Sequence, residues 1–340
     1  MASRARCARK LCARCARPSR ARGSGRPASL SGASQPPEEG KRTVFLGTSE
    51  FAAAVLEQLA GSQHRPLLVI TRPDRPAGRG RRLSSPPVAD AARALGIATE
   101  QPESVNDPAV SRQIGALKAD AVVVCAFGAL IKEPLLSERE ILNLHPSLLP
   151  RWRGAAPIER AIMAGDAETG VAIMRLTAGL DSGPVCLRAV EPISAEDTYG
   201  SLAGRLQRLG GELLMQALDE PLEFIEQDES GVTYAEKISP QDRLLDPSRP
   251  AIELERVVRA LHPHIGARLQ RKDGSFLGVQ SAHVVSAGVV PPPGSLAADT
   301  ERLLYGTADG ALELTRVQPP GARPMDGAAY LRGHGVPSRA

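Results

Sequence analysis

The chain has 340 residues, of which 42% are hydrophobic and only 3% aromatic, so it can bury a sizeable core of mainly aliphatic side chains. None of its apolar runs approaches the roughly 18 residues that suggest a membrane span, which predicts a protein without a membrane segment. The formal net charge of +4 is unevenly distributed, because residues 1–42 carry a net charge of +9 and residues 43–245 a net charge of −7. The overall basic balance is therefore no argument for nucleic-acid binding.

The basic residues gather in an N-terminal tail, residues 1–42, that is rich in Arg, Ala, Ser, Gly and Pro and predicts a disordered segment. Two interpretations stay open. An Arg-rich, acid-poor tail is typical of a mitochondrial presequence, which would place the protein in the mitochondrial matrix. However, Pro18, Pro27, Pro36 and Pro37 would interrupt the amphipathic helix of a presequence. We therefore favour a disordered extension, or translated sequence upstream of the true start, and expect a cytoplasmic protein.

The five cysteines do not predict a metal site. Cys12 and Cys15 form an isolated C-x-x-C without a second pair or a histidine cluster, so zinc is not expected. Cys125 lies in an apolar run and is expected to be buried.

Beyond residue 42, short apolar runs alternate with stretches of helical periodicity. Strands are expected at 43–46, 67–71, 121–126 and 141–144, and helices at 50–60, 87–95 and 107–118. This alternation predicts an α/β domain with a Rossmann-like, mostly parallel sheet, whose ligands bind beyond the carboxyl ends of the strands. A strand pair at 171–176 and 185–190 and a long helix at 198–218 complete the expected catalytic domain, residues 43–226.

A second, smaller domain is expected after a polar, turn-rich linker at 227–250. One helix is expected at 252–261. Five short strand candidates then follow, separated by Gly and Pro, at 267–270, 277–285, 294–297, 303–307 and 311–317. This pattern predicts a small, OB-like β-barrel over residues 251–335.

The segment most informative about chemistry is ILNLHPSLLPRWRGAAP, residues 141–157. Alternation along a strand puts Asn143 and His145 on one face, and an amide beside an imidazole suits acyl-type transfer, because both can stabilise an oxyanion and the ring can carry a proton. Asp181 lies in the Gly-flanked turn AGLDSG, where a carboxylate could orient the histidine. Each of these residues also has a purely structural interpretation, and the residue types alone do not join the three.

The strings NLHPSLLP at 143–150, RGAAP at 153–157 and GLDSG at 179–183, in this order, resemble the folate-dependent formyltransferase family. The resemblance implies Asn143, His145 and Asp181 as catalytic residues and 10-formyltetrahydrofolate as the formyl donor, without a metal. It also implies a folate pocket, whose expected lining is Ala126, Phe127, Gly128, Leu130, Ser147, Leu148, Leu149 and Pro150.

Two further features resemble the members of this family that act on charged tRNA. The first comprises TVFLGTSEFA at 43–52 and the loop RPDRPAGRGRR at 72–82, where five arginines face Asp74 alone within an otherwise acidic domain. Such a loop can hold a phosphate backbone, although a solvated arginine loop is the rival interpretation. The expected substrate contacts are Phe51, Arg72, Arg75, Arg79, Arg81 and Arg82. Phe51 would meet the methionine side chain, with core packing as its alternative role.

The second feature is the continuation past the catalytic domain, where AEKI at 235–238 and GARPMD at 321–326 resemble the same members, whose C-terminal β-barrel holds tRNA. The resemblance covers nearly all of 43–335. It implies a monomeric enzyme of translation initiation that formylates the α-amino group of methionyl initiator tRNA. Three alternatives stay open: a formyltransferase for small amino sugars or amino-nucleotides, a non-catalytic RNA-binding protein on the same scaffold, and a folate hydrolase.

Overall fold

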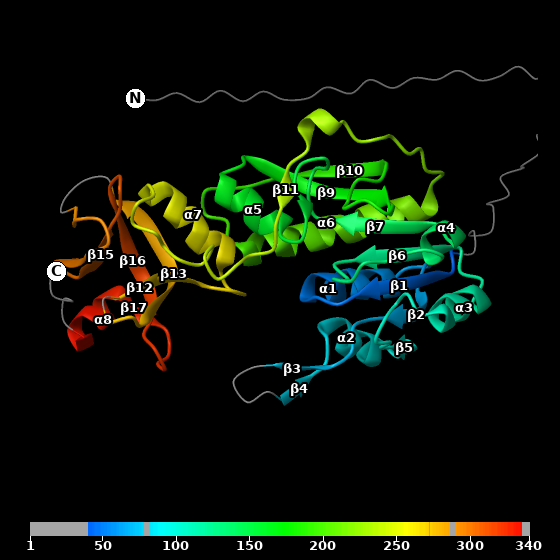
Figure 1. Ribbon diagram of the computed structural model, residues 1–340, viewed down its shortest axis with the longest axis horizontal. Helices are drawn as coiled ribbons and strands as arrows, with labels where there is room; N and C mark the ends of the chain where they lie inside the picture. The colour runs from blue at the N-terminus through cyan, green and yellow to red at the C-terminus, as the bar shows by residue number, and fades with distance from the viewer. Residues whose placement is uncertain (1–39, 78–81, 272, 286–289, 335–340) are drawn as a thin grey trace, which may run out of the picture. The chain divides into compact units, whose positions relative to one another are not determined.

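The computed structural model of the protein describes residues 40–77, 82–271, 273–285 and 290–334 (Figure 1). Residues 1–39 of the tail, which the sequence predicts to be disordered, lie outside the described residues. Within the described residues, no helix is long and apolar enough to cross a membrane.

The first domain is built on a seven-stranded sheet with the order β10-β9-β7-β6-β1-β2-β5. Its parallel strands are β1 (Thr43–Gly47), β2 (Pro66–Ile70), β5 (Thr99–Glu100), β6 (Ala121–Cys125) and β7 (Ile141–His145). Two antiparallel strands, β9 (Glu168–Arg175) and β10 (Val185–Pro192), extend one edge. The mostly parallel α/β sheet predicted from the sequence is confirmed. From β1 the chain continues to β2 and β5 on one side of β1, and then crosses to β6 on the other side. The topological switch point of the sheet therefore lies between β1 and β6.

Helices cover both faces of this sheet, which explains why every residue of β1, β6 and β7 is buried. The helices α1 (Glu50–Ala60), α2 (Pro87–Leu95), α5 (Pro157–Ala164) and α6 (Tyr199–Asp219) contribute to one core cluster. The helices α3 (Pro108–Ala116) and α4 (Leu135–Glu138) contribute to the cluster on the other face. Side chains cap the starts of α1 and α3: Ser49 accepts a hydrogen bond from Ala52 N, and Asp107 accepts one from Ala109 N.

The second domain packs α7 (Ala251–Leu261) on an antiparallel sheet with the order β12-β13-β16-β15-β14. These strands are β12 (Ala267–Gln270), β13 (Phe276–Val285), β14 (Leu296–Asp299), β15 (Arg302–Gly306) and β16 (Ala311–Gln318). A short strand, β17 (Met325–Asp326), pairs with β16 and leads into α8 (Gly327–His334). The predicted β-rich C-terminal domain is confirmed. In the described residues, its hydrogen-bonded strands form an open sheet with β12 at one edge and β14 at the other.

Several short elements were not predicted. The arginine loop contains a hairpin of β3 (Arg75–Ala77) and β4 (Arg82–Ser84). The predicted linker contains a 3-10 turn, η1 (Glu229–Gly231), and β11 (Tyr234–Ala235), which pairs with β8 (Arg153–Gly154) just after the SLLP motif. Residues 233–235 of the predicted linker are therefore hydrogen-bonded to the RGAAP segment, because Arg153 N donates to the Thr233 carbonyl and Ala155 N to the Ala235 carbonyl.

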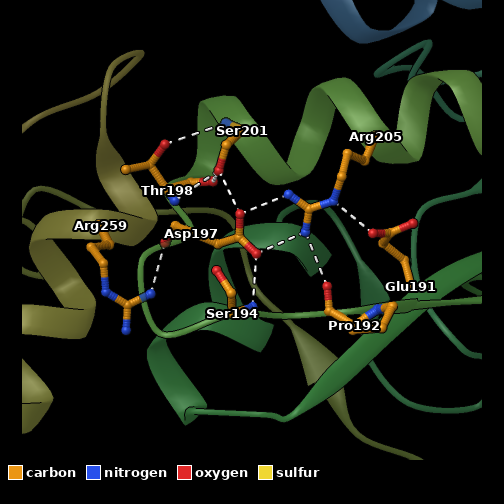
Figure 2. Close-up of polar contacts among 8 residues, drawn as sticks. All are labelled: Glu191, Pro192, Ser194, Asp197, Thr198, Ser201, Arg205 and Arg259. Carbon is orange, nitrogen blue, oxygen red and sulfur yellow. Dashed lines mark hydrogen bonds and ion pairs between the residues drawn. The ribbon is translucent and has the colours of Figure 1, made fainter. Parts of the chain in front are cut away.

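An ionic cluster centred on the buried carboxylate of Asp197 fixes the start of α6 (Figure 2). The carboxylate of Asp197 accepts hydrogen bonds from Arg205 Nη1 and Nη2, both at 2.7 Å, and from the Ser194 N–H at 2.8 Å. Arg259 of α7 donates to the Asp197 carbonyl at 2.7 Å, so the cluster also ties the second domain to the first. The hydrogen bonds from Arg205 hold the pKa of Asp197 well below its ordinary value.

Candidate functional site

A cavity of about 410 Å³ lies at the predicted edge of the sheet, beyond the carboxyl ends of β1, β2 and β6. Its lining comes from the chain after these strands and from the hairpin: Thr48, Ser49, Arg72, Pro73, Arg75, Ser84, Ser85, Pro86, Ala126, Phe127 and Gly128. This is the switch point of the sheet, where open α/β folds bind their ligands.

Two hydrogen bonds connect the walls of this cavity. Thr48 Oγ1 donates to the Phe127 carbonyl at 2.7 Å and so joins the chain after β1 to the chain after β6. A guanidinium nitrogen of Arg72 donates to the Gly128 carbonyl, which holds this arginine at the cavity. Among the described residues, the lining contains two guanidinium groups and no carboxylate. Its electrostatic character therefore favours an anionic ligand.

Asn143, His145 and Asp181 meet at the carboxyl end of β7, the strand next to β6 in the sheet. Asn143 Nδ2 donates to Asp181 Oδ1 at 3.3 Å, and His145 Nδ1 lies 3.6 Å from Asp181 Oδ2. Cys125 pairs with Leu144 across β6 and β7, so these two strands end next to each other, β6 just before Ala126 and β7 at His145. The structure thus brings together three residues that the sequence alone did not join.

The backbone around Asp181 is fixed by groups that the sequence analysis missed. Asp181 has a positive φ of 44° and accepts a hydrogen bond at Oδ2 from the Gly154 N–H at 2.9 Å. Gln227 Nε2 donates to the carbonyls of Asp181 and Gly183 at 2.8 and 2.7 Å. Gln227 is itself buried, at 7% exposure, although its segment was predicted as a linker.

His145 makes its shortest polar contact with the backbone. Its Nε2 lies 2.9 Å from the carbonyl oxygen of Trp152. A carbonyl can only accept, so Nε2 carries the proton and, in the neutral ring, Nδ1 keeps the lone pair. The unprotonated nitrogen then lies on the side of Asp181.

The predicted folate residues do not line a single cavity. Ala126, Phe127 and Gly128 line the switch-point cavity, whereas Leu148 lines a separate cavity of about 250 Å³. Ser147 and Leu149 are buried, at 0% and 2% exposure. Pro150 is half-buried, and Leu130 is 63% exposed. Their role in folate binding stays a prediction.

The residues predicted to contact the substrate also lie in different places. Arg72 and Arg75 line the cavity, and Arg82 lies exposed on β4. Arg79 and Arg81 lie outside the described residues. Phe51 is part of α1, is 5% exposed and packs in the core cluster between α1 and the sheet. Its contact with a methionine side chain stays a prediction.

No cluster of three or more His, Cys, Asp or Glu in the described part of the chain could hold a metal ion. Cys125 is buried, as predicted, and burial raises the pKa of its thiol far above the ordinary value. This thiol is a packing group in the core.

Comparison with known proteins places the chain in a family. Residues 41–218 match the family described as "Formyl transferase" and residues 237–335 match "Formyl transferase, C-terminal domain". Methionyl-tRNA formyltransferase of Ectopseudomonas mendocina (strain ymp) is 45% identical over 290 residues, which cover 84% of this chain and 92% of the relative. That of Halorhodospira halophila is 44% identical over 299 residues, or 86% and 96% of the two chains. The chain therefore belongs to the formyl transferase family and, within it, to the methionyl-tRNA formyltransferases.

Solved structures of more distant proteins share the fold. An N-formyltransferase from Helicobacter canadensis, in complex with folinic acid and dTDP-3-aminofucose, aligns with a TM-score of 0.59 at 15% identity, covering 81% of this chain and 99% of that chain. HypX from Aquifex aeolicus, in complex with tetrahydrofolic acid, aligns with a TM-score of 0.60 at 17% identity, covering 86% and 47%. At these identities the likeness establishes the fold alone.

Proposed function

We propose that the protein transfers the formyl group of 10-formyltetrahydrofolate to the α-amino group of methionyl initiator tRNA, and that Asn143, His145 and Asp181 carry out the transfer. The convergence of these three side chains at the carboxyl edge of the sheet carries the proposal. The 45% identity to a methionyl-tRNA formyltransferase supports the choice of substrate. We also propose a monomeric, cytoplasmic enzyme that acts in translation initiation.

Asn143 stabilises the charge that develops on the formyl oxygen. The neutral α-amine attacks the formyl carbon on folate N10, a carbon–nitrogen bond forms, and the oxygen becomes negative. Asn143 has two amide hydrogens, and one of them is donated to Asp181 Oδ1. The second donates to the oxyanion, in a site where Asn143 is only 7% exposed and water competes poorly.

His145 moves the proton. Its Nδ1, which holds the lone pair, accepts the proton that the attacking amine loses, through a water molecule. The ring returns this proton to folate N10 as the bond between the formyl carbon and N10 breaks. The carboxylate of Asp181, 3.6 Å away, faces the charged ring in the meantime and stabilises it. The proton leaves the amine and ends on tetrahydrofolate, so the exchange is balanced.

The switch-point cavity takes the 3′-terminal nucleotide of the tRNA with its methionyl ester. Arg72 and Arg75 supply guanidinium donors, which suit phosphate. Pro73 and Pro86 supply apolar surface for a base or for the methionine side chain, and Ala126, Phe127 and Gly128 of the predicted folate pocket line the same cavity, so the two substrates would meet there. A volume of about 410 Å³ falls within the roughly 300–1,000 Å³ of small-molecule pockets. The hairpin of β3 and β4 adds Arg82 beside the cavity, where the acceptor stem would continue.

The test compares acceptors. The purified protein is incubated with 10-formyltetrahydrofolate and with methionyl initiator tRNA, uncharged tRNA, a nucleotide-linked amino sugar, or no acceptor. Formyl transfer to methionyl-tRNA alone is the expected result. Transfer to the amino sugar would favour a small-molecule formyltransferase, and equal release of formate without an acceptor would favour a hydrolase.

A further inference from the structure

We infer that Trp152 and Asp166 are positioning residues for His145: the Trp152 carbonyl selects the ring tautomer, and Asp166 holds Trp152 in the backbone conformation that presents this carbonyl. The inference rests on the proposed function, because it assigns a supporting role beside the proposed catalytic residues. Neither side chain is hydrogen-bonded to Asn143, His145 or Asp181 in the described residues; the link to His145 runs through the backbone.

The contact with the Trp152 carbonyl decides which ring nitrogen can act as a base. His145 Nε2 lies 2.9 Å from this carbonyl, and Nδ1 lies 3.6 Å from Asp181 Oδ2. With the carbonyl in place, the proton of the neutral ring stays on Nε2 and Nδ1 is free to accept another. Without it, the proton can move to Nδ1 and donate to Asp181, and a ring in that form cannot take the proton of the amine at Nδ1.

Trp152 does not adopt this conformation by preference. Its φ is +65°, in the left-handed region that a bulky aromatic residue rarely enters. Two residues later, Gly154 has a φ of +125° and its N–H binds Asp181 Oδ2. One strained turn therefore delivers both the acceptor for His145 and the donor for Asp181. Strain of this kind persists only when the surroundings hold it in place.

Asp166 is the centre of the contacts that hold the turn. Its Oδ2 accepts a hydrogen bond from the indole Nε1 of Trp152 at 2.8 Å. Arg151 binds the same carboxylate with two nitrogens, at 2.9 and 2.6 Å, and its guanidinium lies 4.4 Å from the centroid of the Trp152 ring. On the other side, Thr233 Oγ1 accepts from the Trp152 backbone N–H at 2.9 Å. The side chain of Asp166 is only 16% exposed, so water competes little for its oxygens, although the Arg151 side chain is 43% exposed.

The experiment replaces Asp166 and measures both the reaction and the tautomer. Asp166→Ala should lower kcat roughly 10–100-fold, by analogy with the loss of groups that orient metal-bound histidines. KM for folate and for tRNA should change less than about threefold. Asp166→Asn should recover part of kcat, because its amide oxygen can still accept from the indole. Trp152→Phe, which loses the indole N–H together with part of the ring system that packs against Arg151, should fall between Asp166→Ala and the wild type.

A second measurement separates positioning from mere stability. Long-range ¹H–¹⁵N spectra of histidine-labelled protein distinguish the two neutral tautomers, and the His145 signals are assigned by their absence in His145→Gln. The wild type should show protonation at Nε2, and Asp166→Ala a mixture. This readout needs no substrate, so it tests the inference even if the acceptor proves not to be tRNA.

Asp242→Ala is the matched control. Asp242 also binds one arginine with both oxygens, Arg160 at 2.9 and 3.2 Å, and has no contact with Trp152. Its loss should lower the thermal midpoint and leave kcat and the His145 spectrum unchanged. A folded Asp166→Ala with wild-type kcat would overturn the inference. A reduced kcat with an unchanged Nε2-protonated spectrum would overturn it as well.

Discussion

At the scale of single residues, the account depends most on Asn143, whose amide has one hydrogen on Asp181 and the other available to the oxyanion. Asn143→Ala removes the proposed oxyanion donor and should lower kcat by about 10²–10³. KM should change little, because the interaction forms only as charge develops. Steady-state kinetics with methionyl-tRNA measure both constants. A kcat within threefold of the wild-type value would remove Asn143 from the mechanism.

The sequence predicted part of this site. Period-two alternation placed Asn143 and His145 on one face of a strand, and the structure confirms that Leu142 and Leu144 pack in the opposite core cluster. Alternation could not reach Asp181, 36 residues beyond His145, and only the family resemblance joined it to the other two. The Trp152 carbonyl and the Gly154 N–H were missed because any residue type carries these groups. Their role comes from backbone direction, for which the glycine at position 154, with its φ of +125°, is a local sign in the sequence.

At the scale of elements, the hairpin of β3 and β4 presents Arg75 opposite Ser84 and leaves Arg82 exposed. If this hairpin holds the phosphate backbone, Arg82→Ala should raise KM for tRNA and leave KM for folate and kcat unchanged. The slope of log KM against log salt should fall by about one unit, because one phosphate contact is lost.

Arg112→Ala, on the exposed side of α3, is the control for a change in total charge. Equal effects of the two variants would mean that the hairpin has no specific part in tRNA binding.

The cluster around Asp197 gives a prediction of stability against pH (Figure 2). The pKa of Asp197 in the folded protein lies below the value of about 3.9 expected for the unfolded chain. Its ionised form therefore stabilises the fold fully above that value, and the contribution is lost as the pH falls through the folded-state pKa.

Asp197→Asn should therefore cost about 2 kcal/mol of unfolding free energy at pH 7. This is less than the roughly 3–5 kcal/mol of a fully buried pair, because the Arg205 side chain is 36% exposed. Urea unfolding should show that the difference from wild type is constant between pH 6 and 8 and shrinks below about pH 4. A difference that grows as the pH falls would contradict the assigned direction. Asp90→Asn, in an exposed pair with Arg93, should change stability little.

The elements that the sequence predicted best are those with local signals at their ends. The helices at 50–60 and 87–95 were predicted with their observed bounds, because a serine cap or a first-turn proline marks the start and a glycine follows the end. Helix α5 and the two-residue strands β8 and β11 were missed. The pairing of β8 with β11 joins residues about 80 positions apart, and no local periodicity predicts such a contact.

At the scale of the whole molecule, the first described residues are held to the catalytic domain by hydrogen bonds of Lys41 and Arg42. The Lys41 N–H donates to His64 Nδ1 at 2.9 Å, and Arg42 binds Asp120 through its backbone N–H and through its guanidinium, at 2.8 and 2.9 Å. A variant that lacks residues 1–39 keeps these contacts. It should therefore retain the wild-type thermal midpoint, kcat and KM for tRNA. A raised KM would show that the basic tail contributes to tRNA binding.

The measurement that tests the central claim most directly is formyl transfer from 10-formyltetrahydrofolate to methionyl initiator tRNA, by the wild type and by Asp181→Asn. The variant keeps the shape of the side chain and can still accept the Gly154 N–H, so its thermal midpoint should stay close to that of the wild type. Its kcat should fall at least about 10²-fold, because the charged imidazole loses its carboxylate partner. Transfer at the wild-type rate by the variant would contradict the assigned site, and no transfer by the wild type would contradict the assigned reaction.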